Sequence, residues 1–414
     1  MRSILTLLHR WFGLFIAVFL FIAGLTGAII AWDHELDAWL APEFYHSMHQ
    51  AAEQPGQQLS PLELANQLES QHPELTVTFM PLELEPGEAL NAMVATRRTS
   101  LEQEPIELPY NQIGVNAFTG EIQAKRQWGE VSLATDKLIP FIYKLHYTLH
   151  IPDLSAVQAG TLLMGIVGIV WVLDCFIALS ISFPSRAQWR KSFAFRWRSN
   201  SHKLTFDLHR SGGVWVWLLL LMMAITSVSM NLGSQVVNPI VSLFSSITPS
   251  PFETKQPVKI LAPELNREAI VALAKQQAQK ESIQSPAGGI FYSSMMDIYG
   301  VGFYAPGMGH GDMGLGNPWL YFDGKTGAYL GGSIPGKGTA GDVFMQLQFP
   351  LHSGRIIGVT GRIIISILGI VIAMLSVTGV IIWARKRKSR RATRSTKELA
   401  SKESANTILI PSSD

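Results

Sequence analysis

Residues 11–32 read WFGLFIAVFLFIAGLTGAIIAW and contain no charged side chain. A helix needs about 20 consecutive apolar residues to cross a bilayer, so this stretch is long enough to span one. It lacks a small-x-small cleavage site and is followed by Asp33, His34 and Glu35. We therefore expect an uncleaved membrane anchor and not a signal peptide.

Three more stretches are apolar and long enough to cross a membrane: residues 157–181, 212–230 and 363–383. The composition agrees, because 15% of the residues are charged and 47% are hydrophobic, whereas a soluble domain carries about 25% charged residues. A single cysteine, Cys175, excludes a disulfide scaffold. The net charge of +2 argues against a nucleic-acid-binding protein.

Charge is divided unevenly among the polar segments. Residues 183–210 carry seven Lys or Arg and one Asp, and the tail after Trp383 carries nine Lys or Arg and three acids. Residues 33–145 carry seventeen acids and six bases, and residues 231–355 carry eight of each. Because positive residues mark the cytoplasmic side, we expect both termini and the short basic loop in the cytoplasm. The two long segments then lie in the periplasm of a bacterium.

The two halves of the chain share four landmarks in the same order, at offsets of 200, 202, 207 and 206 residues. The landmarks are Leu-His-Arg at 8–10 and 208–210, Ser-Pro at 60–61 and Ala-Pro at 262–263, Thr-Gly at 119–120 and 326–327, and Leu-His at 145–146 and 351–352. Each half therefore predicts a membrane helix, an outer α+β domain and a second membrane helix. An even number of crossings gives both halves the same orientation.

We predict an α-helical membrane protein with four transmembrane helices in two repeat halves and two periplasmic α+β domains. In chain order the predicted segments are a cytoplasmic N-terminus (1–10), a first transmembrane helix (11–32), a first periplasmic domain (33–145), a pre-membrane segment with the second helix (146–182), a basic cytoplasmic loop (183–210), a third helix (211–231), a second periplasmic domain (232–351), a pre-membrane segment with the fourth helix (352–383) and a basic cytoplasmic tail (384–414).

Local patterns predict the contents of the outer domains. Helices are expected at 62–71 and 264–277, each behind a proline in its first turn. Strands are expected at 76–79, 92–96, 113–118, 290–292 and 321–322, which are rich in β-forming residues. The Ser-, Lys- and Arg-rich tail from Lys386 onward predicts a disordered end.

Four of the eleven histidines occupy repeated positions. His9 and His209 lie at the cytoplasmic ends of the first and third membrane helices, and His146 and His352 precede the second and fourth. A single histidine there is more often an interfacial residue, but ionisable groups in membrane helices are costly and usually functional. A pair of imidazoles from two helices is what a b-type haem requires as axial ligands. We therefore predict one haem at each pair, held through its iron.

Neighbouring residues fit such a cofactor. Gly13 and Gly213 follow their histidines at i+4 and leave room for a flat ring, and Arg10 and Arg210 are placed to pair with haem propionates. Asp174 is the only acid well inside a predicted membrane helix, where it either orients a ligand imidazole or bonds a Ser or Thr. Lys144, Arg355 and Arg362 are candidate propionate partners near the second pair.

Two alternatives stay open for the metal sites. A zinc or copper site is less consistent, because two histidines without a Cys or Glu cluster do not complete a tetrahedral set. His150 follows His146 at i+4, and we expect both side chains on one helical face. His150 is then either a neighbour that supports the ligand His146 or an alternate ligand. The glycine-rich loop 304–319, with Met308, His310, Asp312 and Met313, is either a metal or substrate contact or simply flexible.

The LHR openings, the LHYTL at 145–149, the PLHSG at 350–354 and the paired Thr-Gly hairpins together resemble the PepSY-associated transmembrane family. Its members include ferric-siderophore reductases of the bacterial inner membrane. The resemblance implies PepSY-like outer domains and two haem b groups, His9 with His209 on the cytoplasmic side and His146 with His352 on the periplasmic side. No residue is expected to act as a general acid or nucleophile.

The implied function is an oxidoreductase that passes electrons across the bilayer to a ferric siderophore or another periplasmic acceptor, releasing Fe(II). The chain shows no dinucleotide fingerprint, so the electron donor is expected to be a cytoplasmic reductase or the quinone pool. Two other hypotheses are a transmembrane cytochrome that serves a different acceptor or quinone, and a haem-free protein whose outer domains bind a partner.

Overall fold

The computed structural model describes residues 2–48, 57–98, 107–155, 157–258, 262–309, 311 and 313–408, with side chains up to residue 393. Among these residues, four helical segments are long and apolar enough to cross a membrane: Arg2–Ile30, Ala159–Ser182, Trp217–Ser242 and Arg355–Thr393. Only 28–39% of the most apolar window of each segment is buried within the protein. The remaining apolar surface needs an apolar solvent, so the chain is a membrane protein.

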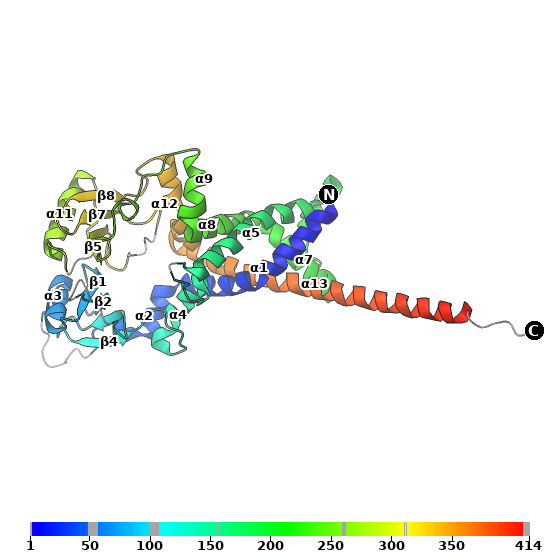
Figure 1. Cartoon of the computed structure of the whole chain (residues 1–414), viewed down its shortest axis with the longest axis horizontal. Coiled ribbons are helices and arrows are strands. Elements are labelled where there is room, and N and C mark those ends of the chain that lie inside the picture. Colours follow the sequence, from blue (N-terminus) through cyan, green and yellow to red (C-terminus); the bar gives the residue numbers. More distant parts are fainter. Residues whose placement is uncertain are drawn as a thin grey trace, which may run out of the picture. The chain divides into compact units, whose positions relative to one another are not determined.

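The described chain divides into two compact units. Unit 1 comprises Met1–Leu25, Ile166–Ile225 and Ile367–Asp414, and unit 2 comprises Thr26–Gly165 and Thr226–Ser366. The long helices α1 (Arg2–Ile30), α5 (Ala159–Ser182), α8 (Trp217–Leu232) and α13 (Gly358–Ile408) each contribute residues to both units (Figure 1).

Eight strands of unit 2, all within the described residues, form one antiparallel sheet in the order β4-β3-β2-β1-β5-β6-β7-β8. The strands are β1 (Leu75–Pro81), β2 (Leu90–Thr96), β3 (Gln112–Val115), β4 (Ile122–Arg126), β5 (Ala287–Ser293), β6 (Ile298–Phe303), β7 (Trp319–Asp323) and β8 (Tyr329–Ser333). The sequence predicts two α+β domains, and the structure joins their strands through β1 and β5, where Phe79 pairs with Phe291.

Two helices cover one face of this sheet, α3 (Pro61–Gln71) and α11 (Arg267–Lys280). Leu64 and Leu68 of α3 and Ile270 and Ala274 of α11 are completely buried in one hydrophobic core with the inward side chains of both strand sets. A buried ion pair adds to this core, because Arg267 donates to Glu69 at 2.5 Å and to the Val77 carbonyl at 2.9 Å. Both halves of the chain therefore share one core.

The N-termini of α3 and α11 are set by capping side chains. The predicted helix 62–71 is confirmed, and Ser60 caps it in a reciprocal pair with Glu63. The predicted helix 264–277 begins later than expected, at Arg267. Asn266 accepts a hydrogen bond from the Ala269 N–H, and this cap sets the first turn in place of the preceding proline.

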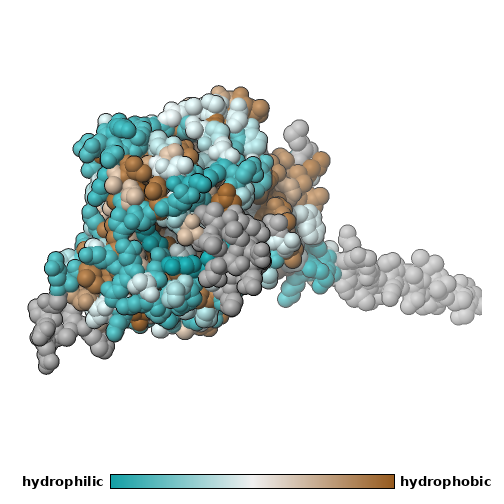
Figure 2. Space-filling model, turned by 60° about the vertical axis from the view of Figure 1, so that its left-hand side comes forward, coloured by the Kyte–Doolittle hydropathy of each residue, from teal (hydrophilic) through white to brown (hydrophobic). Residues whose placement is uncertain are grey.

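The rest of unit 2 consists of shorter helices and turns around the sheet. They are α2 (Asp33–Leu40), η1 (Pro42–Phe44), α4 (Thr135–Thr148), η3 (Gly233–Val237), α9 (Asn238–Ser242), α10 (Pro251–Thr254), α12 (Ala340–Ser353) and η4 (Arg355–Ile357). A buried pair fixes α2 to the sheet, because Arg126 donates to Asp37 at 2.9 Å. The face of the protein that Figure 2 shows is largely hydrophilic, with hydrophobic side chains gathered in separate patches.

Unit 1 holds the basic loop 183–210, with η2 (Arg186–Gln188), α6 (Trp189–Ser192) and the start of α7 (Ser201–Trp215). Asp207 is fully buried and accepts from the backbone N–H and the guanidinium of Arg196. The Arg196 hydrogen bonds hold the pKa of Asp207 below its usual range. Asp207, the only acid of this loop, therefore stabilises the folded conformation of the loop through its hydrogen bonds with Arg196.

Helices extend beyond the apolar stretches in two places. α1 begins at Arg2, and His209 lies within α7, which ends at Trp215 before α8 starts. The prediction of a disordered tail is wrong for residues 386–408, since α13 continues to Ile408. Lys, Arg, Ala and Glu have high helix propensity, and no Gly or Pro interrupts the sequence between Gly379 and Pro411.

Candidate functional site: two pairs of facing histidines

The His9/His209 site lies within unit 1. His9 of α1 and His209 of α7 face each other with ring centroids 6.0 Å apart. The Nδ1 atom of His9 lies 2.9 and 3.0 Å from the two carboxylate oxygens of Asp174 in α5. The Nδ1 atom of His209 lies 3.0 Å from the Leu375 carbonyl and 3.2 Å from the Thr378 hydroxyl. Each imidazole is therefore held in its orientation by a hydrogen bond at Nδ1.

The His146/His352 site lies within unit 2 and has the same design. His146 near the end of α4 and His352 near the end of α12 have ring centroids 6.2 Å apart. The Nδ1 atom of His146 is 3.0 Å from the hydroxyl of Thr26, and that of His352 is 2.9 Å from the hydroxyl of Thr226.

These separations fit one metal ion between each pair. A metal–imidazole bond of about 2 Å and a ring radius of about 1.2 Å place the centroids of two axial imidazoles about 6 Å apart. Every Nδ1 has a hydrogen-bond partner, which is the arrangement of an imidazole that binds a metal through Nε2. The residues present therefore fit bis-histidine ligation of a haem iron at both sites. Among the described residues, no cluster of three or more His, Cys, Asp or Glu could hold a metal ion.

Two glycines that the sequence analysis missed contact the imidazoles. A Cβ atom at Gly27 would approach Cε1 of His146 to 3.0 Å, and one at Gly379 would approach Cε1 of His209 to the same distance. By contrast, a Cβ at Gly13 would meet nothing within 4 Å, and one at Gly213 would lie 3.9 Å from Leu375. The absence of a side chain at Gly27 and Gly379 lets the imidazoles of His146 and His209 pack close to the helix backbone. The space beside Gly13 and Gly213 is open.

Burial keeps two of the imidazoles neutral. Desolvation, with a smaller contribution from the facing ring, lowers the pKa of His209 to about 4 and that of His352 to about 3. Both are therefore uncharged at neutral pH. A neutral imidazole is the form that binds a metal.

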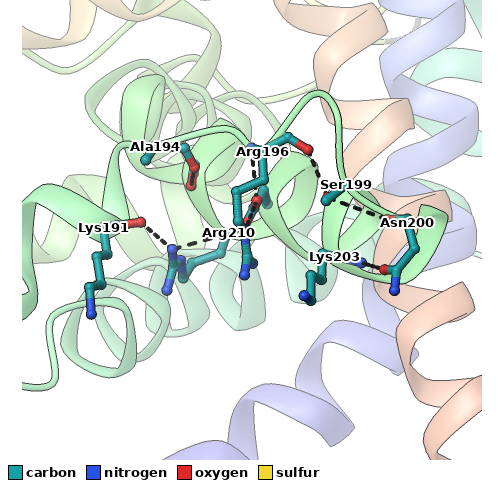
Figure 3. Close-up of polar contacts among 9 residues, drawn as sticks. Lys191, Ala194, Arg196, Ser199, Asn200, Lys203 and Arg210 are labelled. Atoms are coloured by element: carbon teal, nitrogen blue, oxygen red, sulfur yellow. Dashed lines mark hydrogen bonds and ion pairs between the residues drawn. The ribbon is translucent and has the colours of Figure 1, made fainter.

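The arginines near the two sites differ in their partners. Arg210 donates to the Lys191 carbonyl (Figure 3) and lies 4.0 Å from Asp207, and its buried Nε–H has no hydrogen-bond partner among the described residues. That donor suits an acidic group such as a propionate. Arg355 pairs with Asp33 at 3.2 Å, and Arg362 pairs with Glu35 at 2.6 Å. Acids of this chain therefore already neutralise the two arginines near the second site.

The expectation that His146 and His150 share a helical face is wrong. The helix α4 ends at Thr148, and Leu149 and His150 have positive φ angles of 55° and 53°. The ring of His150 instead stacks on Phe141, and its Nε2 lies 3.0 Å from the Phe141 carbonyl. His146 is thus the residue that faces His352, and its role as a ligand stays a prediction.

The glycine-rich loop is described in part. Met308 and Met313 are exposed, and Asn317 donates to the Met308 carbonyl at 2.7 Å. His310 and Asp312 lie outside the described residues. The structure brings no functional partner to Met308 or Met313 among the residues that it describes.

Thr26 and Thr226 are two further site residues that sequence reasoning missed. Each follows the histidine of its own half by 17 positions, His9 or His209, so the repeat itself carries the signal. A threonine in a membrane helix is common, and only the contact with an imidazole from another helix shows what these two hydroxyls do.

The four apolar helices and the antiparallel α/β domain define an integral membrane protein with a large domain outside the bilayer-spanning segments. The chain belongs to the family of the PepSY-associated TM region, whose sequence profile matches residues 6–386. All four paired histidines lie within the matched range. A comparison with curated proteins found no match.

Proposed function

We propose that this protein is a di-haem electron carrier of the bacterial inner membrane that reduces a ferric chelate, such as a ferric siderophore, on the periplasmic side. One observation carries the proposal. Two imidazole pairs have centroid separations of 6.0 and 6.2 Å, with all four Nδ1 atoms hydrogen-bonded from behind.

The chain's own residues perform three tasks at each pair. At each pair the two histidines, which come from two helices, would hold the haem iron through Nε2. Asp174, Leu375, Thr26 and Thr226 hold the rings in orientation and keep the proton on Nδ1. The apolar helices around them exclude water. When bound, the two haem groups supply one-electron transfer.

The charge distribution supports an orientation. The basic loop and both basic ends are assigned to the cytoplasm, and the α/β domain with its acidic segment 33–145 to the periplasm. In this orientation the His9/His209 site receives electrons, and the His146/His352 site delivers them.

The proposed reaction is balanced one electron at a time. A reduced flavin of a cytoplasmic reductase or a membrane quinol gives up two electrons and two protons, and each electron reduces the ferric ion of one chelate to Fe(II). Ferric iron is a hard ion held by oxygen donors. Because Fe(II) is softer and carries less charge, the chelator holds it less strongly and releases it.

The test uses the purified full chain in oriented vesicles. After reduction with dithionite, an impermeant ferric chelate added on the side of the α/β domain should restore the oxidised spectrum within seconds to minutes. Reoxidation by a quinone analogue or by Cu(II), and not by any ferric chelate, would favour a cytochrome with another acceptor. A protein with no haem absorbance would leave a partner-binding role for the α/β domain.

A further inference from the structure

One of the four imidazole anchors differs from the others in charge. His9 contacts a carboxylate, that of Asp174, at 2.9 and 3.0 Å. His146 and His352 contact the hydroxyls of Thr26 and Thr226, and His209 contacts a carbonyl and a hydroxyl. The difference therefore lies between the two sites, with the single carboxylate in the His9/His209 site.

The partners of the two rings come from different halves of the chain. Asp174 lies in α5, which follows α4 in the first half, and Leu375 lies in α13, which follows α12 in the second half. Leu375 offers its backbone carbonyl to His209, where Asp174 offers a carboxylate to His9. The two rings of this site are therefore held by partners of different charge.

The tautomer of His9 follows from ligation. If Nε2 binds iron, Nδ1 carries the proton and donates it in a hydrogen bond to a carboxylate oxygen of Asp174. Asp174 is only 7% exposed, so little solvent screens its charge. A carboxylate behind a metal-bound imidazole makes that imidazole a stronger donor. Stronger donation and a nearby negative charge both stabilise the oxidised iron over the reduced iron.

We propose that Asp174 is a positioning residue that lowers the reduction potential of the His9/His209 site below that of the His146/His352 site. Electrons then run downhill from the first site to the second, and the direction is built into the chain. The inference rests on the proposed function, because it requires a haem at each pair. It goes further by assigning the two sites different potentials and naming the residue responsible.

Single-site variants measure the difference. His146→Ala is expected to leave the His9/His209 haem, and His209→Ala to leave the other. A redox titration followed by visible absorbance should give the retained haem of His146→Ala a reduction equilibrium constant at least tenfold less favourable, which is 59 mV for one electron. Equal constants, or the reverse order, would overturn the inference.

Charge variants of Asp174 then test the cause. In the His146→Ala background, Asp174→Asn keeps a hydrogen-bond acceptor but removes the charge, and should make reduction at least tenfold more favourable. Asp174→Glu keeps the charge, and Thr378→Val removes a neutral partner of the facing histidine; both should change the constant less than threefold. An equal shift in Asp174→Asn and Thr378→Val would assign the effect to packing and overturn the proposal.

Failure of the inference and failure of the proposed function are distinguishable. If Asp174→Asn does not retain haem, Thr26→Asp in the His209→Ala background adds a carboxylate behind His146 and should make reduction at least tenfold less favourable. An unchanged constant there would overturn the inference. A wild-type chain without haem would refute the proposed function itself, whereas two haems with equal potentials would refute only the role of Asp174.

Discussion

Thr26 and Thr226 are bound to their histidines in nearly identical ways, at 3.0 Å from Nδ1 of His146 and 2.9 Å from Nδ1 of His352. The two threonines lie 200 positions apart, the same offset as His9 and His209. Thr26 lies in the first membrane span and Thr226 in the third. His146 and His352 lie in the helices that precede the second and fourth spans. Unit 2 thus builds a symmetric site from corresponding residues of its two halves.

The threonine hydroxyls predict a selective loss of cofactor. Thr26→Val or Thr226→Val keeps the side-chain shape but removes the hydroxyl that bonds Nδ1. Losing the hydrogen-bond partner of a metal-binding histidine weakens metal binding by about 10- to 100-fold. Haem transfer to apomyoglobin should therefore become faster from the His146/His352 site only. Thr26→Ser, which retains the hydroxyl, serves as the control. Equal transfer rates for Thr26→Val and Thr26→Ser would show that the hydroxyl is dispensable.

The four histidines predict two independent sites. His9→Ala or His209→Ala should abolish the haem of unit 1 and keep that of unit 2, and His146→Ala or His352→Ala should do the reverse. His150→Ala is the control for a ring that binds locally to Phe141. Low-temperature spectra of the reduced variants count the bands that remain. Loss of the second haem in His150→Ala, with retention in His146→Ala, would exchange the assigned ligands.

The glycine contacts predict a steric effect on the imidazoles. Gly27→Ala would place a Cβ 3.0 Å from Cε1 of His146, closer than ordinary contact, so the ring must shift. We expect reduced haem occupancy at the His146/His352 site, and the corresponding loss at the other site for Gly379→Ala. Gly233→Ala is the matched control, because its Cβ would meet nothing within 4 Å. Full occupancy in Gly27→Ala would mean that the ring does not need this approach.

The buried ion pair between Arg126 and Asp37 predicts a large effect on stability. Asp37→Ala would leave the completely buried guanidinium of Arg126 without its carboxylate, and breaking such a pair costs about 3–5 kcal/mol. The Tm of the purified protein should fall clearly. Lys325→Ala, which breaks the exposed Lys325–Glu264 pair, should leave Tm nearly unchanged. Similar Tm values for the two variants would contradict the structural role of the buried pair.

Electrostatics of the α/β domain predict a preference among chelates. Residues 33–145 carry seventeen acids and six bases, whereas residues 231–355 are balanced. A cationic or neutral ferric chelate should therefore reoxidise the protein faster than an anionic one of similar size and potential. The difference should shrink between about 0.01 M and 0.15 M salt, where the Debye length falls from about 30 Å to about 8 Å. A preference for the anionic chelate would exclude this domain from acceptor selection.

Local sequence patterns predict the structural features that are determined by residues close together in the chain, such as the membrane spans and the start of a helix. The apolar lengths identify the four spans, and the helix 62–71 follows from Ser60 and Pro61. The repeat identifies all four paired histidines. Asp174 was predicted to orient an imidazole or to bond a Ser or Thr, and the structure places it against His9. Each of these features is visible in a short stretch or in the spacing between two stretches.

The features that the sequence does not reveal are nonlocal or depend on a competing local interaction. The pairing of β1 with β5 joins strands about 200 residues apart, and no turn between them indicates it. The hydroxyls of Thr26 and Thr226 gain their role only from helices that pack beside them. His150 leaves the helical face because α4 ends in a left-handed turn at Leu149. The i+4 spacing of His146 and His150 does not indicate this end of the helix.

The central claim is that each facing histidine pair holds one haem, and cofactor stoichiometry tests it most directly. A pyridine haemochrome assay on the purified full chain, with protein measured by amino-acid analysis, should give two haem b groups per chain. The His9→Ala and His146→Ala variants should each give one, and the double variant should give none. One haem or none in the wild-type protein, after expression with excess haem, would contradict the account.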